Sequence, residues 1–472
     1  QPRKDSMMIR SIAAAILAGR RFELKQSRLG LTMLLGALAV ASFTPSAMAA
    51  SHSQRGQDAS ACFWFGPYVK DNPGFNVGFP DTGAAYWSAN IAMPVGSKIV
   101  LRGQYAHARY QSVSAYEANG AALDSLTDYQ IAPDRGSRNP FLPGERRTSE
   151  KNRSFTVEIR NEAVPASDRA SNTLYAKASA SDRQILIFRL YVPDKNRDLT
   201  GGVGLPVPEL VLADGRRMTG KAACAALNVA AEIVPIPIPT KAQYAALRDR
   251  PGAPDGFPAQ NPPIFHAFYN PKFRTSCLYS LNPGVDCRPA TAPARAGGLY
   301  PNIDNNYIAA YLSRRYGKVL VFRGKLPTVP TTYNRNPRSS EGQLRYWSIC
   351  QTESIATTRT TSCLYDEQVP IDSDRNYVIV SSLDSDRPKN ATAKCGVGFL
   401  SWSAVGDGAG HLDDAYIYVR NLLPSSSFSH ANQNTKLPGD EAAVLGDYLP
   451  RGEYMSIEEF EKMGCPASRD ER

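Results

Sequence analysis

Short apolar segments, several with strict alternation of apolar and polar residues, dominate the chain. The clearest lie at residues 98–104, 109–116, 155–159 and 185–192. A period of two is typical of strands that bury one face, and clusters of Gly, Pro, Asn and Asp separate the segments. The pattern predicts an all-β fold of antiparallel, jelly-roll-like sandwiches with few short helices.

The same series of segments occurs a second time, at residues 319–325, 344–352, 377–381 and 416–422. The polar residues recur in the same order: Arg102, Arg109, Glu117, Asp128 and Gln130 in the first copy, and Arg323, Arg345, Glu353, Asp366 and Gln368 in the second. A repeat of this length is a whole domain. We therefore expect two tandem sandwiches related by internal duplication.

Two proline-rich tracts, residues 233–239 and 251–263, separate the copies and are unsuited to central strands or helices. The expected division is a leader (1–49), a first sandwich (50–232), a linker with a short helix (233–300) and a second sandwich with a C-terminal helix (301–472). Thr240 is a candidate cap for the linker helix, and Ser456 with Glu459 has capping-box spacing for the last one.

The first 49 residues have the features of a secretory signal peptide. Basic residues at Arg20, Arg21, Lys25 and Arg28 precede an apolar run over 29–43, and small residues frame a cleavage site near Ala49. A twin-arginine signal is the less favoured alternative, because an acid interrupts its pattern. We expect a periplasmic or extracellular protein with no transmembrane span after signal removal.

Net charge gives no reason to expect nucleic acid. The formal charge is +10, but the leader holds seven basic and two acidic residues, so its removal leaves +5. This surplus is spread over the mature chain without a basic run or an arginine-rich helix.

All eight cysteines follow the cleavage site, and an even number in an exported chain favours disulfides over metal ligands. Short separations favour two pairs and leave two residual ones. The expected pairs are Cys277 with Cys287, Cys350 with Cys363, Cys395 with Cys465, and Cys62 with Cys224.

The shared charged residues have two interpretations. An Arg and an Asp on neighbouring strands of one copy form a bidentate pair that is costly to break once buried. Alternatively, the carboxylates Glu117, Asp128, Glu353 and Asp366 are the acids and bases of a glycoside hydrolase. We favour the structural interpretation, because both copies need folding whereas an active site usually occurs once.

Residues that the copies do not share are candidates for ligand binding. The second copy has an insertion between Gly324 and Leu344 that carries Tyr333, Arg335 and Arg338, and the first has a loop over 134–147. Loops on a rigid scaffold often carry binding groups, although both have the composition of ordinary solvated connections.

The segment 406–415 groups Asp407, His411, Asp413 and Asp414 in a glycine-rich loop. Oxygen ligands at short spacing suit calcium, and the histidine suits a transition metal. The loop lacks the spacing of an EF-hand, so we expect no cofactor, with calcium as the alternative. No nucleophile elbow, phosphate loop or zinc motif occurs in the chain.

Several phrases resemble those of a group of uncharacterised secreted bacterial proteins with β-sandwich domains. They include Arg109-Tyr-Gln-Ser, Arg189-Leu-Tyr-Val-Pro-Asp194 and Arg420-Asn-Leu-Leu-Pro424. The resemblance implies export and an all-β fold and transfers no activity or site.

These features favour an exported protein that binds a ligand or partner without turnover, such as a glycan or an envelope polymer. Aromatic clusters at 63–68 and 265–269 have the residues to stack on sugar rings or to pack in the core. A secreted hydrolase of carbohydrates or esters is the second hypothesis, and a subunit of a surface assembly is the third. The sequence leaves the oligomeric state open.

Overall fold

Strands account for most of the ordered backbone. The computed structural model describes residues 61–179, 181–236, 238–248, 259–267, 300–436 and 439–465. All of them belong to one compact unit.

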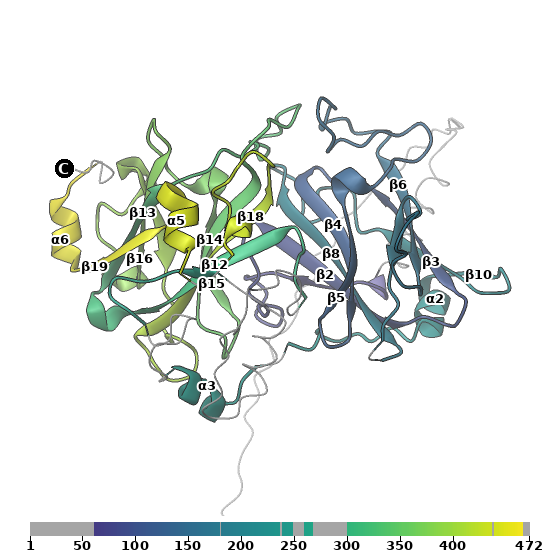
Figure 1. The fold of residues 1–472 in the computed structure, drawn as a ribbon, viewed down its shortest axis with the longest axis horizontal. Helices are drawn as coiled ribbons and strands as arrows, with labels where there is room; N and C mark the ends of the chain where they lie inside the picture. The colour runs from purple at the N-terminus through teal and green to yellow at the C-terminus, as the bar shows by residue number, and fades with distance from the viewer. Residues whose placement is uncertain are drawn as a thin grey trace, which may run out of the picture. The chain divides into compact units, whose positions relative to one another are not determined.

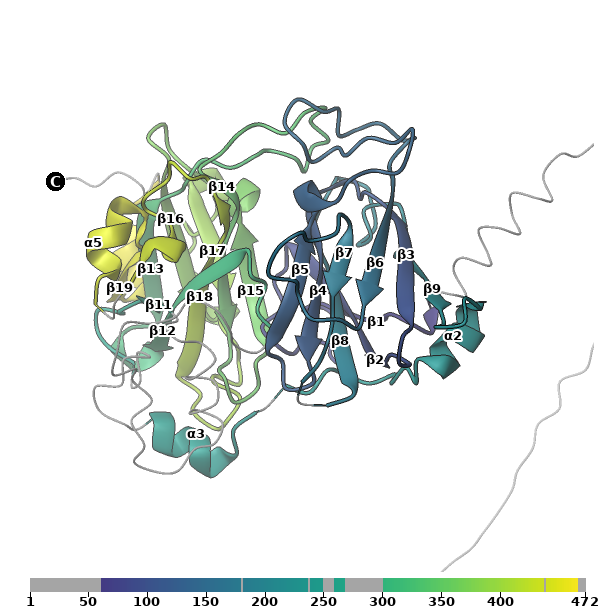
Figure 2. The same ribbon diagram turned by 45° about the vertical axis from the view of Figure 1, so that its right-hand side comes forward.

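The first half contains two five-stranded sheets that pack face to face (Figures 1 and 2). The first sheet has the order β1 (Phe65–Tyr68), β2 (Ala84–Ala92), β8 (Arg183–Pro193), β4 (Ala108–Glu117) and β5 (Ala122–Thr127). The second has the order β10 (Arg217–Thr219), β9 (Val207–Val211), β3 (Lys98–Gln104), β6 (Ser154–Arg160) and β7 (Thr173–Tyr175). Trp87, Leu101, Val157 and Phe188 belong to the apolar core between them.

The second half has the same plan with one strand fewer. One sheet has the order β11 (His266–Ala267), β12 (Asn305–Ser313), β18 (Asp414–Pro424), β14 (Leu344–Thr352) and β15 (Thr360–Tyr365). The other has the order β17 (Val397–Ser401), β16 (Asn376–Ser382), β13 (Val319–Lys325) and β19 (Arg451–Met455). Phe322, Trp347, Ile379 and Ile417 lie in the core between them.

The predicted all-β class with two sandwiches is confirmed. One pairing in each half differs from the antiparallel expectation: β6 with β7, and β16 with β17, run parallel. Alternation of residue types indicates which face a strand buries and carries no information on strand direction.

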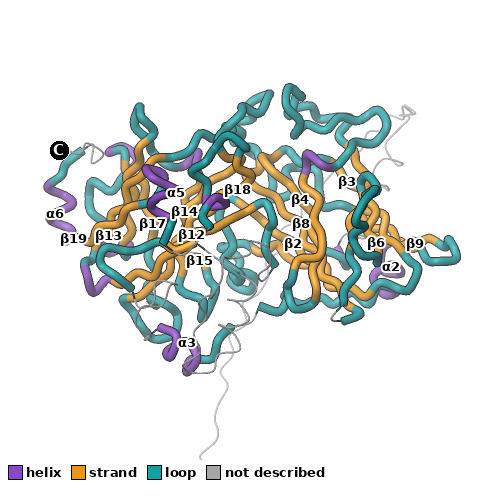
Figure 3. Tube along the Cα trace, viewed as in Figure 1, coloured by secondary structure: helices purple, strands orange, loops and turns teal. Residues whose placement is uncertain are grey.

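Helices are short and lie outside the sheets (Figure 3). The α-helices are α2 (Gly220–Ala226), α3 (Lys241–Arg248), α5 (Glu441–Leu445) and α6 (Ile457–Lys462). The 3-10 helices are η1 (Asp128–Gln130), η2 (Arg314–Tyr316), η3 (Asp366–Gln368), η4 (Asp384–Asp386), η5 (Ala393–Cys395), η6 (Asn432–Asn434) and η7 (Gly446–Tyr448). The predicted capping box of Ser456 and Glu459 starts α6.

No helix in the described ranges is long and apolar enough to cross a membrane.

Disulfides form at three of the predicted pairs: Cys62–Cys224, Cys350–Cys363 and Cys395–Cys465. The first connects the segment before β1 to α2 across a separation of 162 residues. The second links directly opposed residues of β14 and β15. Cys277 and Cys287 lie outside the described residues.

Strands β4 and β18 are buried on both faces, unlike strands that cover a core with one face only. Every residue of β4 is buried, and so are the first nine of β18. One face of each strand packs against the sandwich core of its own half. The other face, with Tyr110 and Ser112 on β4 and Tyr418 and Arg420 on β18, contacts the opposite half.

Candidate functional site

The repeated arginines and aspartates pair across the two halves. Arg109, at the start of β4, donates from Nη1 to both carboxylate oxygens of Asp366, at 2.6 and 2.7 Å. Its Nη2 donates to Glu367, and both the Arg109 and Asp366 side chains are fully buried. Asp366 also accepts from the backbone N–H of Trp347 at 2.9 Å. The pair therefore connects β4 of the first half to η3 of the second.

The reciprocal pair joins the same elements in the opposite direction. Arg345 of β14 lies 3.3 Å from Asp128 Oδ1 in η1 and also donates to the carbonyl of Arg109. Asp128 accepts from the backbone N–H of Gln111 at 3.0 Å. Burial raises the pKa of Asp128 to about 6, although the nearby Arg345 opposes the rise. Both pairs thus support the contact between the halves.

This arrangement corrects the predicted pairing within one copy. Asp128 and Asp366 begin the 3-10 helices η1 and η3, and the partner of each arginine is the aspartate of the other half. The reason is that the sheet face that carries the arginine packs against the opposite sandwich. Strand periodicity shows which residues share a face, but not which part of the molecule packs against that face. The structural interpretation of these residues is otherwise supported by their burial.

The predicted acid and base pairs are far apart. Asp128 bonds the N–H of Gln111, and Glu117 lies six residues farther along β4. That separation is about 20 Å at the usual rise of a strand. Likewise, Asp366 bonds the N–H of Trp347, and Glu353 lies six residues farther along the chain, just after β14. Glycosidases need their carboxylates within about 10 Å of each other, so neither pair has the geometry of that active site.

Other repeated residues have local roles. Gln130 and Gln368 accept from the backbone N–H groups of Thr127 and Tyr365 and so cap η1 and η3. Arg102 is exposed and pairs with Glu209 on the surface at 3.2 Å. The matching caps explain the recurrence of the two glutamines in terms of folding, whereas Arg323, the counterpart of Arg102, contacts Met463.

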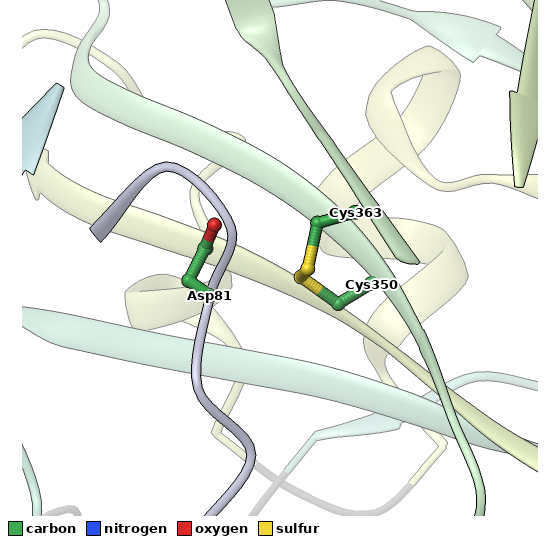
Figure 4. A group of neighbouring side chains, drawn as sticks. All are labelled: Asp81, Cys350 and Cys363. Atoms are coloured by element: carbon green, nitrogen blue, oxygen red, sulfur yellow. A yellow bond between two sulfur atoms is a disulfide. The ribbon is translucent and has the colours of Figure 1, made fainter. Parts of the chain in front are cut away.

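Asp81, just before β2, is a further buried acid between the halves. Its Oδ1 accepts from Tyr346 at 2.8 Å, and its Oδ2 accepts from Ser348 at 2.6 Å and from Arg420. Figure 4 shows Asp81 next to the disulfide between Cys350 and Cys363. The sulfur atoms are bonded to each other, so this group is no metal site.

A cavity of about 120 Å³ lies next to these contacts, between β2 and β8 of the first half and β12 and β18 of the second. Its aromatic lining is Tyr68, Phe79, Tyr86, Tyr191, Tyr300 and Tyr307. Its polar lining also includes Ser88, Arg189, Asn302 and Arg420. The proline-rich tract that was expected to be a plain linker contributes Val234 and Ile236 to the wall. This cavity is the candidate functional site.

The two arginines of the cavity occupy corresponding places in the two inner sheets. Arg189 of β8 lies between Tyr86 and Ser112 of its neighbouring strands. Arg420 of β18 lies between Tyr307 and Ser348. Side chains opposite one another in adjacent strands share a face, so each arginine projects from its sheet with a tyrosine on one side and a serine on the other.

Their surroundings differ. Arg420 pairs with Asp81, and its guanidinium lies 5.3 Å from the ring of Tyr307. Burial lowers the pKa of Arg420 to about 9, which leaves it protonated at neutral pH. Arg189 donates to Ser114 Oγ at 3.1 Å and to the carbonyl of Tyr300 at 2.9 Å. Within the part of the chain that the structure describes, no carboxylate pairs with Arg189.

Both arginines lie in the segments that recur in the sequence, 185–192 and 416–422, and were not predicted as a site. Each is a charged residue within a nearly continuous apolar strand, at a corresponding position of the two segments. A buried charge without a partner is expensive, so such a residue indicates either a buried acid elsewhere or a ligand. Arg420 has a buried acid as its partner, namely Asp81.

The predicted ligand-binding loops contact each other instead of lining the cavity. Tyr333, Arg335 and Arg338 are exposed, and Arg335 pairs with Glu150 of the first half at 3.3 Å. Arg147, from the loop over 134–147, donates to the carbonyl of Asn336 at 3.0 Å. Their role in binding remains a prediction.

The loop with Asp407 brings three of the four predicted metal ligands together. Asp407, His411 and Asp414 each offer a ligand atom, and these atoms lie within 4.8 Å of one another. They also have protein partners: His411 Nδ1 lies 2.6 Å from Asp407, and Arg248 lies 2.5 Å from Asp414. Asp413 is exposed and is not in the group. Two carboxylates and an imidazole suit a transition metal better than calcium, and a metal here remains a prediction.

No protein-family model matches the chain, and no curated protein matches it. An uncharacterised protein from Burkholderia cenocepacia is similar in structure, with a TM-score of 0.42 and 11% identity over 88% of this chain and 92% of that one. A protein from Vibrio parahaemolyticus has a TM-score of 0.38 and 11% identity over 80% and 90% of the two chains. An anti-sigma factor domain-containing protein from Clostridium clariflavum has a TM-score of 0.20 and 8% identity over 77% and 83%. The first two are uncharacterised, in agreement with the expectation from the sequence.

Near the contacting loops, His107 is expected to make stability depend on pH. Its side chain is 2% exposed. Burial, together with Arg153, Arg197 and Arg147, lowers the pKa of His107 to about 4 and outweighs the opposite effect of Glu150. The unfolded chain therefore takes up the proton first as the pH falls from about 6.5, and up to about 3 kcal/mol of stability is lost by pH 4.

Urea unfolding of the wild type and of His107→Gln between pH 7 and pH 4 measures this loss. The variant is expected to lose less stability than the wild type over that range. Equal pH dependence in both proteins would contradict the assignment to His107.

Proposed function

We propose that the protein is an exported binding protein without catalytic turnover, and that its ligand occupies the cavity between the two sandwiches. Three disulfides support export, because such bonds persist in oxidising compartments. The observation that carries the proposal is the cavity itself, which five tyrosines and two buried arginines line. Ligand sites occur preferentially between domains and combine aromatic walls with a few polar groups.

The size of the cavity limits the ligand to a small molecule. A cavity of roughly 150 Å³ holds a molecule the size of benzene, and the volume here is about 120 Å³. A single small sugar unit or another ring compound therefore fits this volume better than the glycan or envelope polymer that the sequence suggested.

The lining favours binding over turnover. Within the described ranges it contains no Asp, Glu, His or Cys. The hydroxyl of Ser88 is hydrogen-bonded to Tyr68 at 3.0 Å. General acid–base catalysis most often uses His, Asp or Glu, and a nucleophilic serine is activated by an adjacent base. The hydrolase hypothesis has no comparable support, since its carboxylates are the separated Glu117, Asp128, Glu353 and Asp366.

The aromatic clusters do not provide an alternative sugar platform. Phe63 and Trp64 are buried, as is Phe265. Their burial supports a packing role and leaves the cavity as the better place for a ring to stack on tyrosine.

A thermal-shift screen of the mature protein against monosaccharides and small ring compounds tests the proposal. Ile187→Phe is designed to fill the cavity, because Ile187 lines it, and Val95→Phe adds the same bulk at a site that is 94% exposed. A ligand is expected to raise the melting temperature of the wild type and of Val95→Phe, and to have little effect on Ile187→Phe. A ligand that stabilises Ile187→Phe as strongly as the wild type would place binding elsewhere.

A further inference from the structure

We propose that the ligand is a small monocarboxylate with a ring-sized body, whose carboxylate pairs with Arg189. This inference rests on the proposed binding function and specifies the chemistry of its ligand. Its basis is the charge balance of the cavity, which differs from that of the rest of the contact between the halves.

Each of the other arginines of the central contact pairs with an acid, including Arg345, whose side chain is 20% exposed. Arg109 pairs with Asp366, Arg345 with Asp128, and Arg420 with Asp81. Arg189 is 4% exposed, and among the described residues its hydrogen bonds go to Ser114 and the Tyr300 carbonyl, with the side chain of Tyr116 also beside it, so its neighbours are all neutral. One positive charge of the cavity is therefore uncompensated, although the equivalent charge of Arg420 is neutralised.

The buried polar atoms of the lining that have no hydrogen-bond partner among the described residues are all donors. Arg420 Nε and Asn302 Nδ2 are buried donors with no hydrogen-bond partner within the described residues. Both residues line the cavity together with Arg189. Buried donors normally have acceptors, and a carboxylate is a group that only accepts hydrogen bonds. Free donors and an unpaired cation thus favour the same kind of ligand.

Arg189 is held in place for this role. Its contacts to Ser114 Oγ and the Tyr300 carbonyl fix two of its nitrogens, and its guanidinium lies 5.5 Å from the ring of Tyr116. A fixed guanidinium loses less entropy when it binds a carboxylate than a mobile one. The site therefore has a preorganised cation.

A carboxylate with a ring suits the cavity better than phosphate does. A monoanion balances the one uncompensated charge, whereas phosphate carries a charge of about −1.5 to −2 at pH 7. Phosphate also has no apolar body to contact the tyrosines and the side chains of Val234 and Ile187. A ring acid and a sugar acid share the required chemistry and differ only in the polarity of the ring.

Calorimetric titration of the mature wild-type protein with matched probes tests the charge requirement. We expect benzoate to bind at least about ten-fold more tightly than benzyl alcohol, or glucuronate at least about ten-fold more tightly than glucose. If the difference appears between benzoate and benzyl alcohol, the ligand is a ring acid; if it appears between glucuronate and glucose, the ligand is a sugar acid. Neutral probes that bind as tightly as the acids would overturn the carboxylate while leaving the proposed binding function intact.

Two further outcomes also count against the inference. Tighter binding of inorganic phosphate than of either acid would show an anion site of a different class. Absence of binding by all four organic probes would overturn the monocarboxylate, and the wider thermal-shift screen with Ile187→Phe then decides separately on the proposed function.

Arg189→Gln tests the residue. It keeps a polar side chain and removes the charge, so benzoate or glucuronate affinity is expected to fall at least about ten-fold. Arg102→Gln is the matched control, since Arg102 is a strand arginine of the same half with a side chain 56% exposed, and its affinity should equal that of the wild type. Unchanged affinity for the acid in a folded Arg189→Gln variant would overturn the assignment of the carboxylate to Arg189. If that variant does not fold, the comparison of acid and neutral probes on the wild-type protein decides whether the site requires a carboxylate.

Discussion

Replacing Asp81 with alanine is expected to lower the free energy of unfolding by about 3–5 kcal/mol. The carboxylate is fully buried and accepts hydrogen bonds from Tyr346 and Ser348 of the second half and an ion pair from Arg420. Removing it leaves the buried Arg420 charge without an acid and two hydroxyl donors without this acceptor. The loss is therefore larger than that of an ordinary hydrogen bond, which contributes about 1 kcal/mol.

Urea unfolding followed by circular dichroism measures this loss. Asp71→Ala is the matched control, because Asp71 lies near in sequence with a side chain 86% exposed beside Lys70. The control is expected to change stability by less than about 1 kcal/mol. Equal, small losses in both variants would contradict the role of Asp81 in joining the halves.

Arg109→Ala is expected to have a loss of similar size, about 3–5 kcal/mol. The variant leaves Asp366 buried without its bidentate partner and removes the bond to Glu367. It also removes the donor to Thr332 Oγ1 at 3.0 Å. Three contacts to the second half are lost together, so the effect should appear as weaker coupling between the two sandwiches.

A double-mutant cycle with Asp366→Ala separates the pair from the other contacts. The two substitutions are expected to be non-additive by more than about 1 kcal/mol, because either one alone breaks the same ion pair. Arg102→Ala, which breaks only the exposed pair with Glu209, should cost no more than about 1 kcal/mol. Additive losses for Arg109 and Asp366 would show that the pair does not form.

The strands could be predicted from the sequence because their signal is local. Alternation over 98–104 and the apolar run over 185–192 correspond to β3 and β8. The Cys350–Cys363 disulfide followed from a short separation, and the capping box of α6 followed from Ser456 and Glu459. Each of these features depends on residues that are near in the chain or repeat at a fixed period.

The contact between the sandwiches could not be predicted in the same way. The sequence predicted that a repeated arginine and a repeated aspartate on neighbouring strands pair with each other, whereas Arg109 and Asp128 each have their partner in the other half. The partners are more than two hundred residues apart, and which face of a sandwich meets the other depends on docking. The cavity was missed for the same reason, since Arg189 and Tyr307 meet only once the halves pack together.

A crystal structure of the mature protein with benzoate, or with glucuronate if that acid binds more tightly, tests whether Arg189 binds a carboxylate in the cavity. The ring is expected among Tyr86, Tyr191 and Tyr307, with the carboxylate within hydrogen-bonding distance of Arg189. An acid bound at another surface, or a buried carboxylate of the protein itself paired with Arg189, would contradict this expectation.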